Sequence, residues 1–157
     1  AGKSTLIKAI LGTSFETRGK LCRGNLKILY VDQRCSILDE RKNIFENIRD
    51  VSRLDENEIR NGLAKFLFTK DSVFQKVSSL SGGERLRATL ARGLLSAEKP
   101  EILILDEPTN NLDLLNIQFL ENFIREFQGA LIVVSHDEVF LKNANVTEVF
   151  DFSLRDD

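Results

Sequence analysis

The chain of 157 residues contains no methionine, not even at its first position, and it has only two cysteines and one histidine. Because it opens on Ala1-Gly2 without an initiating methionine, we expect it to be a piece of a longer protein. Cys22 and Cys35 do not have the spacing of a metal site, so we expect free thiols in a cytoplasmic protein rather than a disulfide.

Long apolar runs and an excess of one charge are also missing. No apolar stretch approaches the roughly 20 residues of a membrane span, and no internal repeat or low-complexity segment is present. We also expect no signal peptide. The 22 basic residues nearly balance the 24 acidic ones, so net charge argues neither for nor against nucleic acid. The length and a hydrophobic fraction of 42% allow one globular domain with a sizeable core.

The clearest element that is present is an apolar run ending in two acids. Residues 102–105 are aliphatic without alternation, as in a strand buried on both faces, and Asp106 and Glu107 follow. Pro108 lacks a backbone N–H and is expected to end the strand. Ligands of open α/β sheets bind beyond the carboxyl ends of the strands, where a magnesium ion would match two acids. A strand-end aspartate is also a common turn former, so the pair alone leaves both interpretations open.

Two further strands are expected to end in polar residues. Residues 26–31 lead to Gln33, and the apolar segment Ala130–Val134, expected to be buried, leads to His136. Alone, such a glutamine is usually a solvated amide and a single histidine is usually structural. Strands separated by helices predict a mostly parallel sheet. Gln33, Asp106 and His136 would then share one crevice.

Two expected helices begin with glycines. Gly2-Lys3-Ser4 matches the end of the pattern G-x-x-x-x-G-K-[ST], in which backbone N–H groups and lysine bind phosphate and the hydroxyl binds Mg²⁺. Such a short match also occurs by chance. Before the second helix, Ser81 and Glu84 have the spacing of a capping box, and the serine could serve only as a cap. Glycines in a first turn cost about 1 kcal/mol each relative to alanine, so Gly82 and Gly83 suggest a second anion site.

The remaining segments complete an alternating pattern of helices and strands. Residues 40–49 and 55–68 have apolar residues at helical spacing and predict a small helical subdomain over residues 37–80. We also expect a loop or short hairpin over residues 13–25, helices over residues 114–127 and Glu138–Asn143, and a final strand over residues 146–152.

In this order, the motifs resemble an ATP-binding cassette (ABC) domain over nearly the whole chain. The matches are Gly2, Lys3, Ser4 and Thr5 with the end of the Walker A loop, Gln33 with the Q-loop, residues 80–84 with the signature sequence, residues 102–107 with the Walker B strand and its glutamate, residues 110–113 with the D-loop, and His136 with the switch histidine. The resemblance implies a P-loop NTPase-type α/β fold: a mostly parallel sheet with flanking helices, a core of residues 1–36 and 81–157, and a helical subdomain of residues 37–80. The first strand and leading glycines of Walker A would precede Ala1, so we expect an N-terminally truncated domain that by itself binds ATP poorly and does not hydrolyse it.

The resemblance also implies a role for each matching residue in the hydrolysis of ATP between two cassettes, either in tandem or as a homodimer. Glu107 would polarise the attacking water and His136 would donate to the γ-phosphate. The nucleotide-binding residues would be Gly2, Lys3, Ser4, Thr5 and Gln33, with Ser81, Gly82 and Gly83 serving the ATP of the other cassette. Ser4, Gln33 and Asp106 would hold Mg²⁺.

The subfamily is indicated by Asn110-Asn111-Leu112-Asp113, which is similar to the Asn-x-Leu-Asp of ABC-F proteins. Transporter cassettes more often have Ser-Ala-Leu-Asp there, and Glu84 replaces their usual glutamine. This resemblance implies a cytoplasmic protein without a membrane domain that acts on the ribosome, and antibiotic resistance by ribosome protection is the more specific role that it suggests. Three alternatives stay open: the nucleotide-binding subunit of an ABC membrane transporter, a chromosome-maintenance or DNA-repair ATPase, for which the long coiled-coil arms are missing, and a non-catalytic scaffold.

Overall fold

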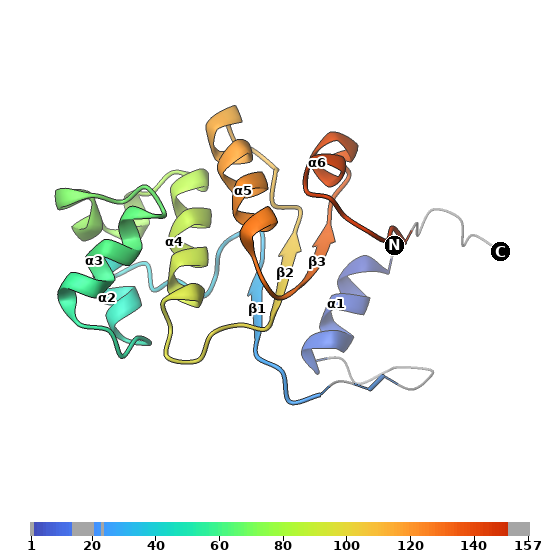
Figure 1. The fold of residues 1–157 in the computed structure, drawn as a ribbon, viewed down its shortest axis with the longest axis horizontal. Helices are drawn as coiled ribbons and strands as arrows, with labels where there is room; N and C mark the ends of the chain where they lie inside the picture. Colours follow the sequence, from blue (N-terminus) through green and yellow to red (C-terminus); the bar gives the residue numbers. More distant parts are fainter. Residues whose placement is uncertain (1, 14–20, 23, 151–157) are drawn as a thin grey trace.

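The computed structural model describes residues 2–13, 21–22 and 24–150, and its centre is a three-stranded sheet in the order β1-β2-β3. The strands are β1 (Ile28–Val31), β2 (Ile102–Asp106) and β3 (Ala130–Val134). Both pairings are parallel, with Ile102 aligned to Ile28 on one side and to Ala130 on the other. The predicted parallel sheet is confirmed, and all three strands point toward the same edge (Figure 1).

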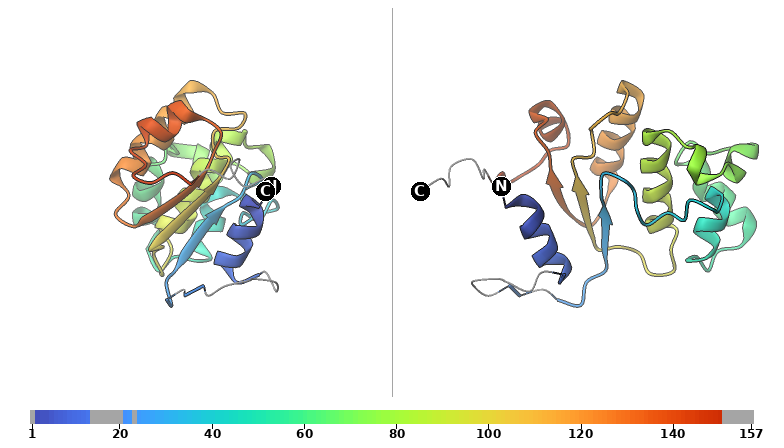
Figure 2. Two further views of the ribbon diagram at one scale, coloured as in Figure 1. Left: turned by 90° about the vertical axis from the view of Figure 1, so that its right-hand side faces the viewer. Right: turned by 180° about the vertical axis from the view of Figure 1, so that it is seen from behind.

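Helices lie on both sides of this sheet (Figure 2). α1 (Lys3–Leu11) is on one side, whereas α5 (Leu114–Glu126) and α6 (Glu138–Asn143) are on the other. α4 (Gly82–Leu94) packs closely against β1, because a Cβ added at Gly93 would lie 2.4 Å from the Leu29 side chain. The three central residues of β2 are fully buried, so the sheet edge that carries the predicted site rests on a packed core.

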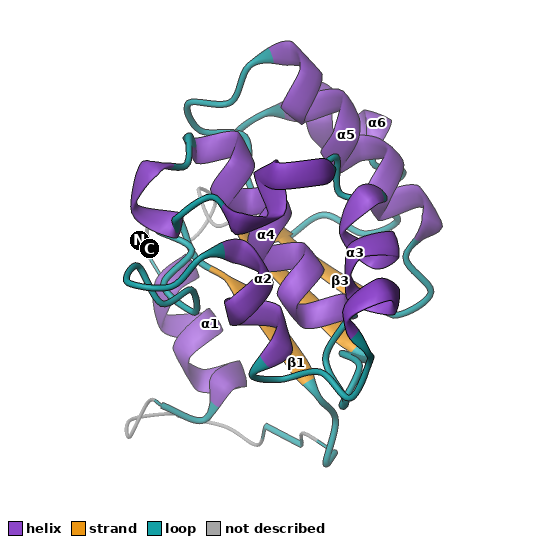
Figure 3. Cartoon of the chain, turned by 90° about the vertical axis from the view of Figure 1, so that its left-hand side faces the viewer, coloured by secondary structure: helices purple, strands orange, loops and turns teal. Residues whose placement is uncertain are grey.

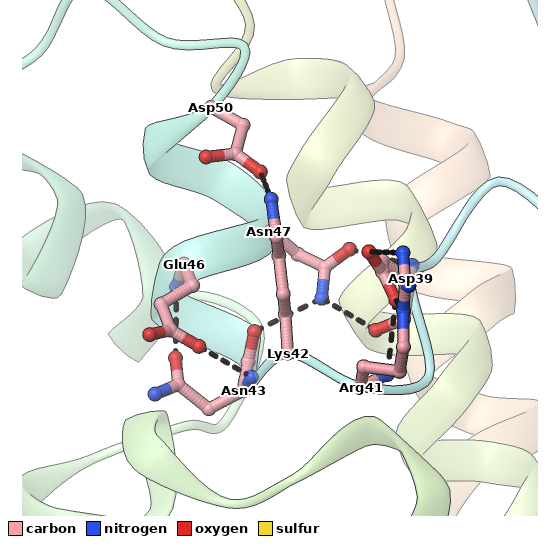
Figure 4. A network of polar contacts seen from close by, with 7 residues as sticks. All are labelled: Asp39, Arg41, Lys42, Asn43, Glu46, Asn47 and Asp50. Atoms are coloured by element: carbon pink, nitrogen blue, oxygen red, sulfur yellow. Dashed lines mark hydrogen bonds and ion pairs between the residues drawn. The ribbon is translucent and has the colours of Figure 1, made fainter.

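The helices described between β1 and α4 are α2 (Ile44–Arg49), α3 (Glu56–Ala64), and the 3₁₀ helices η1 (Lys70–Phe74) and η2 (Val77–Ser79) (Figure 3). An isolated antiparallel bridge joins Asn43 to Lys76 in the same stretch. The buried Asn47 amide organises the entry to α2 by accepting from the N–H of Asp39 and donating to the carbonyls of Asp39 and Asn43 (Figure 4). Asn43 and Glu46 then close a capping box. The division into a core and a helical subdomain stays a prediction.

The predicted final strand is wrong over its described part. Residues 146–150 form no strand, and Val149 and Phe150 are 72% and 79% exposed. A strand needs a neighbour for its backbone hydrogen bonds, and none of the described strands lies beside this segment. Residues 151 and 152, like most of the loop or hairpin predicted over residues 13–25, lie outside the described residues.

Two other expectations need smaller corrections. β3 is not buried as predicted, because it is an edge strand among the described residues: Ala130 is exposed and the other four residues are half-buried. The helix predicted over residues 55–68 ends at Ala64, shortly before Leu67 adopts a left-handed φ of 64° that an α-helix cannot accommodate.

Candidate functional site

A pocket of about 230 Å³ lies at the carboxyl ends of β1 and β2. Gln33 follows β1, Asp106 and Glu107 stand at the end of β2, and Gly82 begins α4; all of them line the pocket. Because parallel strands end at the same edge of a sheet, residues that are far apart in the sequence meet here. The structure thus places predicted nucleotide, metal and catalytic residues around one space.

Lys3, His136 and Glu107 form a direct cluster beside this pocket. The Nε2 atom of His136 lies 3.1 Å from the Lys3 Nζ and 3.2 Å from the Glu107 Oε1. The ammonium group only donates and the carboxylate only accepts, whereas one ring nitrogen of a neutral histidine does one or the other. The imidazole can therefore accept from Lys3 in one tautomer or donate to Glu107 in the other. Its side chain is 79% exposed, so a ligand can reach it.

The backbone holds Glu107 in an unusual conformation. Its φ of 48° lies in the left-handed region, which costs a non-glycine residue on the order of 1 kcal/mol or more. The Glu107 N–H donates to the carbonyl of Val134 at 2.7 Å, so the pairing between β2 and β3 holds this residue in place. The side chain is only 14% exposed, and its Oε2 accepts from the His136 N–H at 3.4 Å. The carboxylate is thus directed to a fixed position at the sheet edge.

Asp106 has a partner that sequence analysis missed. The Tyr30 hydroxyl on β1 donates to the Asp106 Oδ2 at 3.1 Å. Burial, followed by the charge of Asp106, raises the pKa of Tyr30 to about 12, so the hydroxyl keeps its proton. Tyr30 pairs with Ile104 in the sheet, two residues before Asp106, and this proximity becomes visible only once the strand register is known.

The N-terminus of α1 is open. Its N-cap residue is Gly2, with a left-handed φ of 103°, and no side chain caps the first turn, which also contains no acid. Helix N-termini with free N–H groups bind phosphate, and Lys3 adds a positive charge. This segment fits the predicted phosphate site. Ser4 and Thr5 are exposed, and their hydroxyls donate no hydrogen bond to another described residue.

The N-terminus of α4 is closed on itself. The Ser81 Oγ accepts from the Glu84 N–H at 3.3 Å, and the Glu84 Oε2 accepts from the Ser81 N–H at 2.8 Å. Ser81 and Gly82 are exposed, whereas Gly83 is buried against the Asn116 side chain. Gly82 borders the pocket of its own chain, although the sequence predicts that it serves the nucleotide of another cassette. Ser81 does not line that pocket.

The residues at this edge fit Mg²⁺ only as part of a larger set of ligands. Among the described residues, no three His, Cys, Asp or Glu side chains gather as a metal site. Mg²⁺ usually binds through one or two carboxylates, substrate phosphates and several waters. The carboxylate of Asp106 and the amide oxygen of Gln33, which line the same pocket, are donors of this kind, and Ser4 lies at the nearby start of α1.

The chain is similar to several known proteins. The sequence model of the family described as ABC transporter matches residues 1–110. The putative ATP-binding protein YdiF of Bacillus subtilis (strain 168) is 42% identical over 154 residues, which cover 97% of this chain and 24% of that protein. ABC transporter F family member 5 of Arabidopsis thaliana is 36% identical over 161 residues, which cover 99% of this chain and 23% of that protein.

The fold is also similar to a solved structure, the complex of archaeal ribosomal stalk protein aP1 and archaeal ribosome recycling factor aABCE1. The TM-score is 0.70 at 29% sequence identity, covering 91% of this chain and 28% of that chain. The chain thus spans about a quarter of the length of the relatives that it matches. None of the described helices combines the length and apolar character needed to cross a membrane.

Proposed function

Because the chain belongs to the ABC transporter family, we propose that it is the ATP-hydrolysing cassette of a cytoplasmic protein that acts on the ribosome. It is an ABC ATPase domain with a P-loop NTPase fold, and its relatives include an ABC-F protein. The convergence of Lys3, His136 and Glu107 at the sheet edge carries the catalytic part of this proposal. In this cluster, the ammonium group could bind phosphate, the carboxylate could orient a water molecule, and the imidazole lies between the two.

In the proposed reaction, Mg-ATP supplies the phosphoryl group and a metal charge when it is bound. The first N–H groups of α1 and the ammonium group of Lys3 bind phosphate oxygens. Ser4, Gln33 and Asp106 would hold the metal, and the Tyr30 hydroxyl keeps Asp106 oriented. Phosphoryl transfer depends mostly on positioning and charge stabilisation, which these residues provide without a covalent intermediate.

Glu107 is the residue proposed to orient and polarise the attacking water. Its side chain is only 14% exposed and its backbone has a fixed left-handed conformation. The carboxylate therefore already has a defined position and does not need to rearrange before the reaction. When Lys3 turns toward phosphate, it leaves the Nε2 of His136. The ring can then adopt the tautomer whose Nε2–H donates to Glu107 or to a phosphate oxygen.

A second cassette completes the proposed site. Ser81 and Gly82 are exposed at the start of α4, where backbone N–H groups of a glycine turn suit an incoming phosphate. Ser81 and Glu84 also cap each other within the chain. In this proposal the exposed turn serves the nucleotide of a partner cassette, in tandem or in a homodimer. Hydrolysis would then require the two cassettes to close.

The ribosomal part of the proposal rests on the relatives. One similar structure is a complex of a ribosomal stalk protein with a ribosome recycling factor, and another relative is an ABC transporter F family member. The turn Asn110-Asn111-Leu112-Asp113 resembles that subfamily rather than transporters. Protection of ribosomes against antibiotics is the finer form of the proposal. The main alternative is the nucleotide-binding subunit of a membrane transporter.

The test uses Glu107→Gln in the full-length protein, with Glu126→Gln on α5 as an exposed control. We expect Glu107→Gln to retain ATP binding but to lose turnover by about 100-fold to 10,000-fold, the usual contribution of a general base. With ATP, the trapped variant should sediment with ribosomes, whereas the control should behave as wild type. Turnover close to that of wild type would remove the catalytic role, and co-migration with membranes instead of ribosomes would favour the transporter alternative. In vitro translation with ribosome-targeting antibiotics, with and without added protein, then tests protection.

A further inference from the structure

A buried amide joins the starts of α4 and α5. Asn116 lies in the first turn of α5 and is 6% exposed. Its Nδ2 donates to the Asp113 Oδ1 at 2.8 Å, and its Oδ1 accepts from the Nε of Arg87 on α4 at 3.1 Å. The two ends of one side chain are therefore engaged by two different elements.

Arg87 fixes this amide on the side of α4. It is buried, and its Nη1 donates to the carbonyl of Phe66 at 3.0 Å and to that of Leu67 at 3.5 Å. Its guanidinium carbon lies 5.0 Å from the ring centroid of Phe68. Burial lowers the pKa of Arg87 from its ordinary value. A buried guanidinium with several acceptors is costly to displace, so Arg87 is a firm anchor for Asn116.

Gly83 lies directly against the same amide. A Cβ added at Gly83 would be 2.2 Å from the Asn116 Nδ2, closer than any side chain could approach. The backbone of the first turn of α4 thus packs against the Asn116 side chain. On the other side, Asp113, the N-cap of α5, also accepts a hydrogen bond from the Asn116 N–H at 2.8 Å. A shift of either turn must move this side chain.

We propose that Asn116 is a positioning residue that makes the Ser81-Gly82-Gly83 turn and the turn ending at Asp113 move as one unit. The inference rests on the proposed function, in which the Ser81-Gly82-Gly83 turn serves the nucleotide of a second cassette. Asn116 ties that turn to the start of α5, and misplacement of such a group by about 1 Å can cost on the order of 100-fold in rate. Asn116 holds the register between these turns without touching the nucleotide.

The kinetic test compares Asn116→Asp with Asn122→Asp in the full-length protein. The first variant keeps an acceptor for Arg87 but replaces the donor to Asp113 with a repelling carboxylate, whereas the second adds the same charge at an exposed position of α5. We expect Asn116→Asp to lower kcat more than about tenfold, with the KM for ATP within about threefold of wild type, because Lys3 and α1 are unaffected. The Asn122→Asp variant should match wild type. If the kcat of Asn116→Asp, corrected for the folded fraction from urea titration, equals that of wild type, the proposal is wrong.

Hydrogen exchange gives a second readout that does not depend on ATPase activity. In Asn116→Asp, amide exchange should become faster in both residues 81–86 and residues 113–117, while β2 keeps its protection. Faster exchange in residues 113–117 alone would contradict the coupling, and faster exchange throughout the chain would show a general structural role instead. If wild type does not hydrolyse ATP, the proposed function fails, and the exchange pattern still decides whether the two turns are coupled.

Discussion

The starts of α1 and α4 both combine glycine with a nearby serine, but the structure uses them differently. At α1 the N-cap is a left-handed glycine, no side chain caps the turn, and Lys3 lies beside it. At α4, Ser81 and Glu84 satisfy each other in a capping box. An open helix start in a protein provides donors for a ligand, whereas a capped one has already used part of them. We therefore propose that α1, rather than α4, binds phosphate within this chain.

The two glycines at the start of α4 also differ in their surroundings. A Cβ at Gly82 would meet nothing within 4 Å, whereas one at Gly83 would collide with Asn116. Gly83 is thus required by packing inside the chain. Gly82 has no such internal reason, and in a first turn it costs about 1 kcal/mol relative to alanine. The exposed glycine is the one whose presence the proposed contact with a second nucleotide explains.

Among the changes that test this comparison, removing the charge at the open start should have the largest effect. Lys3→Ala is expected to weaken ATP binding between about tenfold and 100-fold, because a charge-assisted hydrogen bond contributes about 1.5–3 kcal/mol. Lys8→Ala, at the other end of α1, is the matched control and should bind as wild type. Calorimetric titration of the full-length proteins with Mg-ATP makes the comparison. Equal affinities for both variants would show that α1 does not hold the phosphates.

Replacing each of the two glycines of α4 with alanine should distinguish an effect on protein stability from an effect on ligand binding. Gly83→Ala is expected to lower the free energy of unfolding by about 1–3 kcal/mol, as overpacking does. Gly82→Ala should leave stability unchanged or raise it by up to about 1 kcal/mol, yet lower ATP turnover. Urea titration and phosphate release measure the two effects. Similar losses of stability in both variants would contradict the difference in their surroundings.

Removing the cap of α4 should have a moderate effect. Ser81→Ala is expected to cost about 0.5–1 kcal/mol of stability, at the lower end for an N-cap because the hydrogen bond to Glu84 is 3.3 Å long. Ser81→Asp retains a capping oxygen and should recover most of this loss. If urea titration shows no difference between alanine and aspartate, the capping box does not stabilise α4.

The smallest expected effect is a dependence on pH. Arg85, in the first turn of α4, donates to Glu40, and this bond lowers the pKa of the Glu40 carboxyl. A carboxyl whose pKa is lowered by folding adds stability above its unfolded pKa and loses it as the pH falls through the folded value. Glu40→Gln should therefore be slightly less stable than wild type near neutral pH and equal to it in acid. Because the Glu40 side chain is exposed and that of Arg85 is half-buried, added salt should shrink the difference. If the difference in stability persists in acid, it does not come from the ionised Glu40 carboxylate.

Much of the sheet edge could be predicted from the sequence. The aliphatic runs before Gln33, Asp106 and His136 each end in polar residues, and alternating helices require parallel strands. Their carboxyl ends must then meet, and the structure places Gln33 with Asp106 in one pocket and His136 against the adjacent Glu107. Short-range patterns also revealed the capping box at Ser81, because its partners are only three residues apart.

Contacts between distant segments could not be predicted in this way. The bond from Tyr30 to Asp106 depends on strand register, and the contact between Arg87 and Asn116 depends on how two helices pack. The strand prediction that is wrong over residues 146–150 has a similar cause, since the apolar residues of this segment do not reveal whether a neighbouring strand exists. Periodicity reports the preference of a segment, whereas pairing and packing decide the result.

One structure would test the central claim most directly: the full-length Glu107→Gln protein solved with Mg-ATP. The account predicts that the β- and γ-phosphates lie against the first N–H groups of α1 and the ammonium group of Lys3, with His136 turned away from that lysine. A Ser-Gly-Gly turn from a second cassette should face the same nucleotide. Phosphates bound instead against Gly82 of the same cassette, with the start of α1 free of ligand, would contradict the account.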